Sequence, residues 1–100
     1  MTSFDCREEA FEAKFAHDAE RAFKARARAL RMLGLWAAEK RGETGAAAED
    51  YARALIEADI VTPDAAFNKL VLDLAGHGID SRKIRKKRDA LFAIVQSASA

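Results

Sequence analysis

Apolar residues recur along the chain at intervals of three and four, which is the period of an amphipathic α-helix. The longest such segment runs from Thr2 to about Arg41, contains no proline and is rich in Ala, Glu, Lys, Arg and Leu, which favour helices. Only Gly34 interrupts it, and we interpret that glycine as a weak point. Gly42 and Gly45 are the expected end of the helix and the turn after it.

Three shorter helices are predicted after this segment, at about 46–59, 63–76 and 82–97. Because no alternating strand pattern is present, the expected fold is all-α, a small four-helix bundle with short loops. The residues expected to face its core from these helices are Ala47, Tyr51, Ala54, Leu55 and Ala58, then Phe67, Leu70, Val71 and Leu74, and finally Ile84, Leu91, Phe92 and Val95.

Capping residues give the expected starts of the shorter helices. Thr44 is the expected N-cap of the helix at 46–59. Thr62 as N-cap with Pro63 in the first turn is expected to begin the next helix. Asp80 or Ser81 is the expected cap of the last one.

The first helix is too long for the others to cover. A helix over residues 3–41 would extend about 58 Å, whereas helices of about 14–16 residues reach only about 21–24 Å. We therefore expect the shorter helices to pack on its second half, at about 19–41, so that the bundle comprises residues 19–100 and residues 1–18 form a mobile arm that is helical on binding. The residues expected at the packed half are Phe23, Leu30, Leu33 and Trp36.

The arm carries its own apolar line. Phe4, Phe11 and Phe15 follow each other at intervals of seven and four, so on a helix they lie within about 20° of one line. Ala22, Ala29 and Leu33 continue that line. An apolar stripe without an internal partner predicts an external one; the alternative is that the arm folds back and its Phe side chains join the core.

Charge is balanced overall but segregated locally. The 17 Lys and Arg against 16 Asp and Glu give a formal net charge of +1, so the whole molecule is not a polycation. The first helix begins acidic and becomes basic, which suits either the helix dipole or contacts with a partner. The run from Arg82 to Arg88 has six cations in seven residues. We interpret it as a solvated face with some protein contact; a helical nucleic-acid- or nucleotide-binding module is the alternative.

Residues suited to catalysis or metal binding are sparse. His77 lies between two glycines, and Cys6 has no histidine near it in the sequence. His17 has no second metal ligand one turn away; it is expected between arm and bundle, either solvated or as a pH-sensitive site. We therefore expect no enzyme, no metal and no cofactor. With a single cysteine, no signal peptide and no long apolar stretch, we expect a cytoplasmic protein without direct membrane insertion.

The first helix also contains an ordered series of short motifs. They are FD at residues 4–5, RE at 7–8, AFE at 10–12, KFAHD at 14–18, FKA at 23–25 and LGLWAAE at 33–39. This series closely resembles the zeta inhibitor subunit family of alphaproteobacterial F-type ATP synthases. The similarity is strong over about residues 3–41, and the other helices match in layout. Cys6 stands where the family more often has a carboxylate, a departure that removes no aromatic anchor.

The resemblance implies a regulatory subunit that inhibits ATP hydrolysis. In this family an N-terminal arm becomes helical at the interface of the catalytic alpha and beta subunits with the rotor, and blocks rotation in the hydrolysing direction. The family thus implies the ATP synthase headpiece as partner, a monomer when free, no nucleic acid, and a peripheral place on the inner membrane. The partner-binding residues that it implies in this sequence are Phe4, Arg7, Glu8, Phe11, Glu12, Lys14, Phe15, His17 and Asp18.

Overall fold

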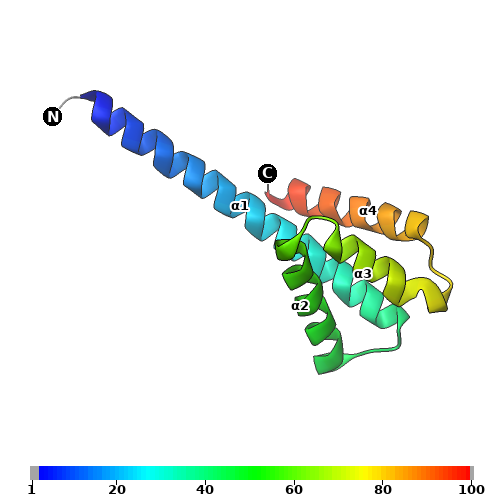
Figure 1. Ribbon diagram of the computed structural model, residues 1–100. Coiled ribbons are helices and arrows are strands. Elements are labelled where there is room, and N and C mark those ends of the chain that lie inside the picture. Colours follow the sequence, from blue (N-terminus) through cyan, green and yellow to red (C-terminus); the bar gives the residue numbers. More distant parts are fainter. Residues whose placement is uncertain (1–2, 100) are drawn as a thin grey trace.

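Four helices form a bundle from which the first helix projects (Figure 1). The computed structural model describes the backbone of residues 3–99 and the side chains of residues 18–97. Its elements are α1 (Ser3–Lys40), α2 (Gly45–Val61), α3 (Ala65–Leu74), the 3₁₀ turn η1 (Ala75–His77) and α4 (Ser81–Ser99). No strand occurs in this part of the chain, and the predicted all-α class is confirmed.

The elongated shape follows from the length of α1. The molecule measures 63 × 23 × 23 Å, and α1 alone has 38 residues, which corresponds to about 57 Å. The other helices flank only its C-terminal half (Figure 1). Side chains 18–24 are all exposed, and Ala29 is the first buried one among the described side chains. The overhang expected from the helix lengths is therefore present, whereas the division into a mobile arm and a bundle at residue 18 stays a prediction.

One hydrophobic core joins the four helices. Fully burying a Leu or Ile side chain contributes about 1.5–3 kcal/mol, so a few such residues from each helix hold the bundle together. The largest fully buried side chains are Leu33, Leu55, Leu70, Leu74 and Ile84. The rings of Trp36, Phe67 and Phe92 are partly buried and pack against this cluster.

Two residues expected in the core lie outside it. Phe23 is 57% exposed, and at its level of α1 the residues that face α4 are Ala22 and Arg26 instead. Ala47 is exposed, and its neighbour Ala48 is buried instead. The start of α2 consists largely of alanines, so its hydrophobic pattern does not fix which of two adjacent positions faces inward.

The backbones of α1 and α2 approach each other closely at Gly34. A Cβ atom at Gly34 would lie 2.7 Å from the Cα atom and 3.0 Å from the Cβ atom of Ala52. Because α1 is unbroken from Ser3 to Lys40, the predicted weak point at Gly34 is wrong. The glycine is instead the residue that allows the two helices to meet.

We expect Gly34→Ala to lower the free energy of unfolding by about 1–3 kcal/mol, because overpacking outweighs the helix propensity gained from alanine. Gly76→Ala is the matched control, since a Cβ atom there meets nothing within 4 Å. That variant should be neutral or slightly stabilising. Chemical denaturation of both variants measures the difference. Equal stability of Gly34→Ala and the parent would contradict the close crossing.

The ends of α1 and α4 follow their sequence signals. α1 ends in a Schellman motif, in which the Gly42 N–H donates to the Glu39 carbonyl at 3.0 Å and the Glu43 N–H donates to the Ala38 carbonyl at 2.8 Å. Gly42 has φ 80°, a conformation that favours glycine. At the start of α4, Asp80 Oδ1 accepts from the backbone N–H of Lys83 at 2.9 Å, which confirms Asp80 as a cap.

The start of α3 differs from its prediction. Thr62 is the C-cap of α2, where its N–H donates to the Ala58 carbonyl, and α3 begins only at Ala65. The ring of Pro63 keeps the preceding residue out of the helical region, so Thr62 is extended and a turn separates the two helices. Thr44 precedes α2 as expected, but its side chain makes no capping hydrogen bond.

Candidate partner-binding surface

The predicted partner-binding residues all belong to the projecting part of α1 (Figure 1). Asp18 is the only one with a described side chain, and it is exposed. The structure places the others on one continuous helix by their backbone alone. The residues that lie outside the described side chains are Phe4, Arg7, Glu8, Phe11, Glu12, Lys14, Phe15 and His17.

Arg26 fastens α1 to the bundle at the level where the helix projects. Its Nε and Nη2 donate to the two carboxylate oxygens of Asp59 in α2 at 2.7 and 2.6 Å. The same guanidinium lies 5.5 Å from the ring centroid of Phe92 in α4. The hydrogen bond to Asp59 raises the pKa of Arg26 against the opposing effect of burial. One side chain thus links three helices, a role the sequence could not indicate because its partner is 33 positions away.

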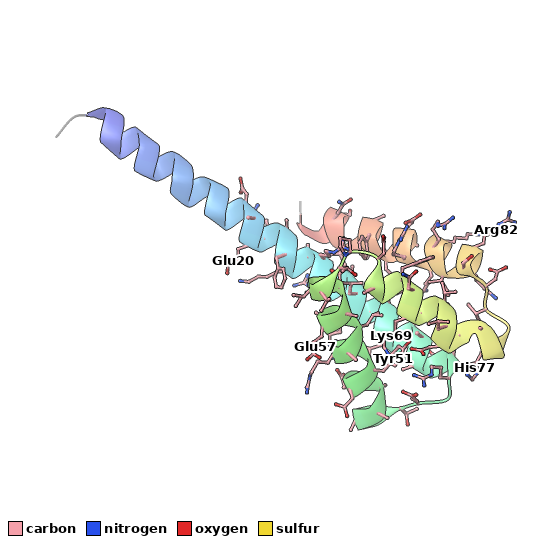
Figure 2. All side chains as sticks on the ribbon, viewed as in Figure 1. Glu20, Tyr51, Glu57, Lys69, His77 and Arg82 are labelled. Carbon is pink, nitrogen blue, oxygen red and sulfur yellow. The ribbon has the colours of Figure 1, made fainter. Side chains whose placement is uncertain are left out.

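Other cations in this part of α1 are also used within the molecule. Arg31 Nη2 donates to both carboxylate oxygens of Glu49 at 2.7 and 2.9 Å. Lys24 Nζ lies 3.0 Å from Glu20 Oε1 one turn earlier (Figure 2 labels Glu20). Both pairs are about half or more exposed, so each contributes little to stability. The basic segment that follows the predicted arm is therefore partly neutralised by local partners.

A shallow groove of about 590 Å³ lies between α1 and the C-terminal half of α4. Its walls include Ala22, Ala25 and Ala29 on one side and Phe92 and Val95 on the other. Two of these alanines belong to the line that the Phe residues of the arm begin in the sequence. The apolar line therefore leads into an open apolar groove, where small side chains leave room for another protein.

A polar cluster around Tyr51 joins the end of α1 to α2 and α3 (Figure 2). The Tyr51 hydroxyl donates to Asp73 Oδ2 at 2.8 Å, and Lys69 Nζ lies 3.3 Å from the same oxygen. The guanidinium of Arg41 lies 4.7 Å from the Tyr51 ring centroid.

Burial and the hydrogen bond raise the pKa of Tyr51. Burial opposes ionisation of Asp73, but hydrogen bonds from Tyr51 and Lys69 prevail and lower its pKa. Both pKa shifts are set by burial and hydrogen bonding within the cluster.

This cluster makes stability sensitive to alkaline pH. The folded-state pKa of Tyr51 lies above its unfolded value of 10.0, so its contribution is complete below pH 10 and is lost as pH rises beyond it. Denaturation between about pH 7 and 11 should show a steeper alkaline loss for the parent than for Tyr51→Phe, which keeps the ring. Tyr51→Phe itself should cost about 0.5–1.5 kcal/mol at neutral pH. Identical pH profiles would contradict the coupling.

Part of the basic run in α4 covers aromatic rings. Arg85 and Arg88 lie 5.6 and 5.2 Å from the ring centroid of Phe67, and Lys87 lies 5.9 Å from that of Trp36. Such contacts offset the unfavourable position of cations near the positive end of a helix. The remaining cations of the run, all exposed, are Arg82, Lys83 and Lys86. Nucleic-acid or nucleotide binding by this run stays a prediction. Half of its cations are engaged with aromatic rings of the same molecule, which leaves fewer of them for phosphate groups.

The described residues give no sign of a metal centre or a membrane span. Among their side chains, no group of three His, Cys, Asp or Glu is placed to hold a metal ion. His77 is exposed on η1 (Figure 2). Within the described chain, no helix combines the length and apolar character needed to cross a bilayer.

The structure is thus that of an all-α protein in which one long helix projects from a small bundle, with an open apolar groove at its base. A family model described as ATPase inhibitor subunit zeta matches residues 1–98. The chain belongs to this family, which confirms the resemblance found in the sequence. The family is that of an ATPase inhibitor subunit, so the chain is a regulatory protein rather than an enzyme. Comparisons with curated proteins and with solved structures found no match.

Proposed function

We propose that this protein inhibits ATP hydrolysis by inserting residues 1–18 at the interface of the catalytic alpha and beta subunits with the rotor. The carrying observation is that α1 continues as one helix from Lys40 to Ser3 while the other helices flank only its C-terminal half (Figure 1). The projecting part therefore reaches a partner without any rearrangement of the core. A helix that lies in a groove of another protein is a common mode of recognition.

The aromatic line supplies the binding free energy in this proposal. Burial of Phe4, Phe11 and Phe15 would contribute roughly 5–9 kcal/mol before the cost of ordering the chain. Glu8 and Glu12 would add charge-assisted contacts beside these anchors. The groove at Ala22 and Ala29 continues the same line, so the apolar contact can extend to the base of the arm.

The shape of the molecule supports a steric block of rotation. An α-helix with its side chains is about 10–12 Å wide, so it can lie between subunits that would otherwise close on each other during hydrolysis. The bundle, about 23 Å across, is too wide to follow the helix inside and stays on the surface of the headpiece. A monomer bound in this way would lie on the cytoplasmic side of the inner membrane. It would be attached to the membrane only through the synthase.

Titrating purified headpiece with the full chain tests the proposal. ATP hydrolysis should fall along a saturating curve, and ATP synthesis by inverted membrane vesicles should be much less affected because the block acts in one direction. Hydrolysis that stays constant at saturating concentrations of the protein would overturn the proposal.

A further inference from the structure

Five large hydrophobic side chains in the described part of the molecule are more than half exposed. Isolated exposed side chains of this kind are ordinary, whereas a group of them indicates an interaction surface. The five residues are Phe23, Ile60, Val61, Leu72 and Ile94. The first three lie close in the chain to Arg26 and Asp59, which form an ion pair between α1 and α2, and we call them the shoulder.

The Arg26–Asp59 ion pair holds together the segments of α1 and α2 that carry the three residues of the shoulder. Phe23 precedes Arg26 by one helical turn on the side of the arm, and Ile60 and Val61 directly follow Asp59. The exposed fractions are 57% for Phe23, 64% for Ile60 and 78% for Val61. The core therefore does not use these side chains.

The backbone of the shoulder is fixed by the turn between α2 and α3. The Thr62 N–H donates to the Ala58 carbonyl at 3.3 Å, and the Ala65 N–H donates to the Thr62 carbonyl at 3.2 Å. Pro63 restricts the turn further. An apolar surface on such a turn loses little conformational freedom when another protein covers it.

The end of α2 that carries Ile60 and Val61 lies near the base of the projecting part of α1 (Figure 1). Figure 1 shows the connection between α2 and α3 against α1, close to where α1 leaves the bundle. A protein that enclosed the projecting part of α1 would come close to this end of α2. Leu72, by contrast, lies on α3 one residue before Asp73, in the part of that helix that packs at Tyr51.

We propose that the shoulder is a second contact surface for the ATPase headpiece. It would pack on apolar residues at the rim of the headpiece site into which the arm inserts. The inference rests on the proposed function and adds a contact from the bundle, which would set how far the arm enters. A second copy of this chain is a poorer occupant. Three partly exposed side chains offer far less than the about 1,200 Å² that a stable dimer buries.

The double variant Ile60→Ser with Val61→Ser tests the shoulder. The concentration for half-maximal inhibition of ATP hydrolysis should rise about ten- to hundredfold, the loss expected when two apolar contacts are removed. The melting temperature should not fall, because both side chains are exposed. Leu72→Ser is the matched control, since Leu72 is 77% exposed on another face, and its inhibition should equal that of the parent.

The other outcomes distinguish the two proposals. If Ile60→Ser with Val61→Ser inhibits like the parent while Phe11→Ala with Phe15→Ala does not inhibit, the shoulder is overturned and arm insertion stands. If neither double variant changes inhibition, both proposals fail. An equal loss in Leu72→Ser would overturn the shoulder as a specific surface. So would a concentration-dependent dimer, seen by light scattering, that the shoulder variant abolishes.

Discussion

A chain that lacks residues 1–18 should fold normally and lose its inhibition of ATP hydrolysis. We expect the core to need nothing from the deleted segment, because the described side chains 18–24 are all exposed and the first buried one on α1 is Ala29. We expect helical circular dichroism, a melting temperature within a few degrees of the parent, and fluorescence of the partly buried Trp36 that is unchanged. The shoulder and groove alone should give no measurable inhibition.

A peptide of residues 1–18 is the complementary control. It would carry the three Phe anchors but would bear the full cost of ordering its backbone, about 1–2 kcal/mol per residue before hydrogen bonds form, so it should inhibit weakly or not at all. A truncated protein that unfolds would show that the arm packs on the bundle. One that folds and inhibits like the parent would move the functional surface to the bundle, with the basic α4 as the first candidate.

The second large effect is expected from Phe11→Ala with Phe15→Ala. Truncation of an aromatic anchor in an interface costs about 2–4 kcal/mol, so the pair should raise the half-inhibitory concentration by at least about a hundredfold. Thermal unfolding should be nearly unchanged. Ala13→Gln is the matched control, because the helical period puts position 13 on the side opposite the aromatic line. Full inhibition by the double variant would refute the anchors, and a collapse of its melting temperature would place both rings in the core.

Signals that act over a few residues were sufficient to predict most of the helix ends. Gly42 adopts the positive φ that the end of α1 requires, and Asp80 caps α4, because both effects depend only on adjacent backbone. The overhang of α1 followed from helix lengths alone. The misplaced start of α3 also has a local cause: Pro63 was expected in its first turn, but residues 62–64 form a turn and α3 begins at Ala65.

Features that depend on the placement of one helix against another could not be predicted. The exposure of Phe23 depends on which side of α1 faces the other helices, and the role of Gly34 depends on how close α2 comes to it at Ala52. Arg26 and Tyr51 have partners 33 and 22 positions away, for which a single sequence offers no pairing signal. The candidate site divides in the same way: its aromatic line is a periodicity in the sequence, whereas its groove and shoulder exist only after packing.

The close crossing at Gly34 also fixes how the projecting helix is rotated about its own axis relative to the bundle. Because α1 has no break between Ser3 and Lys40, its residues turn together about one axis, by about 100° per position. A Cβ atom at Gly34 would lie only 2.7 Å from the Cα atom of Ala52, so a rotation of α1 that put a larger residue on that side would cause a backbone clash. The direction of the line through positions 4, 11 and 15 is therefore determined inside the core, about 28 Å from Phe15. A partner would meet the aromatic edge at one angle to the bundle.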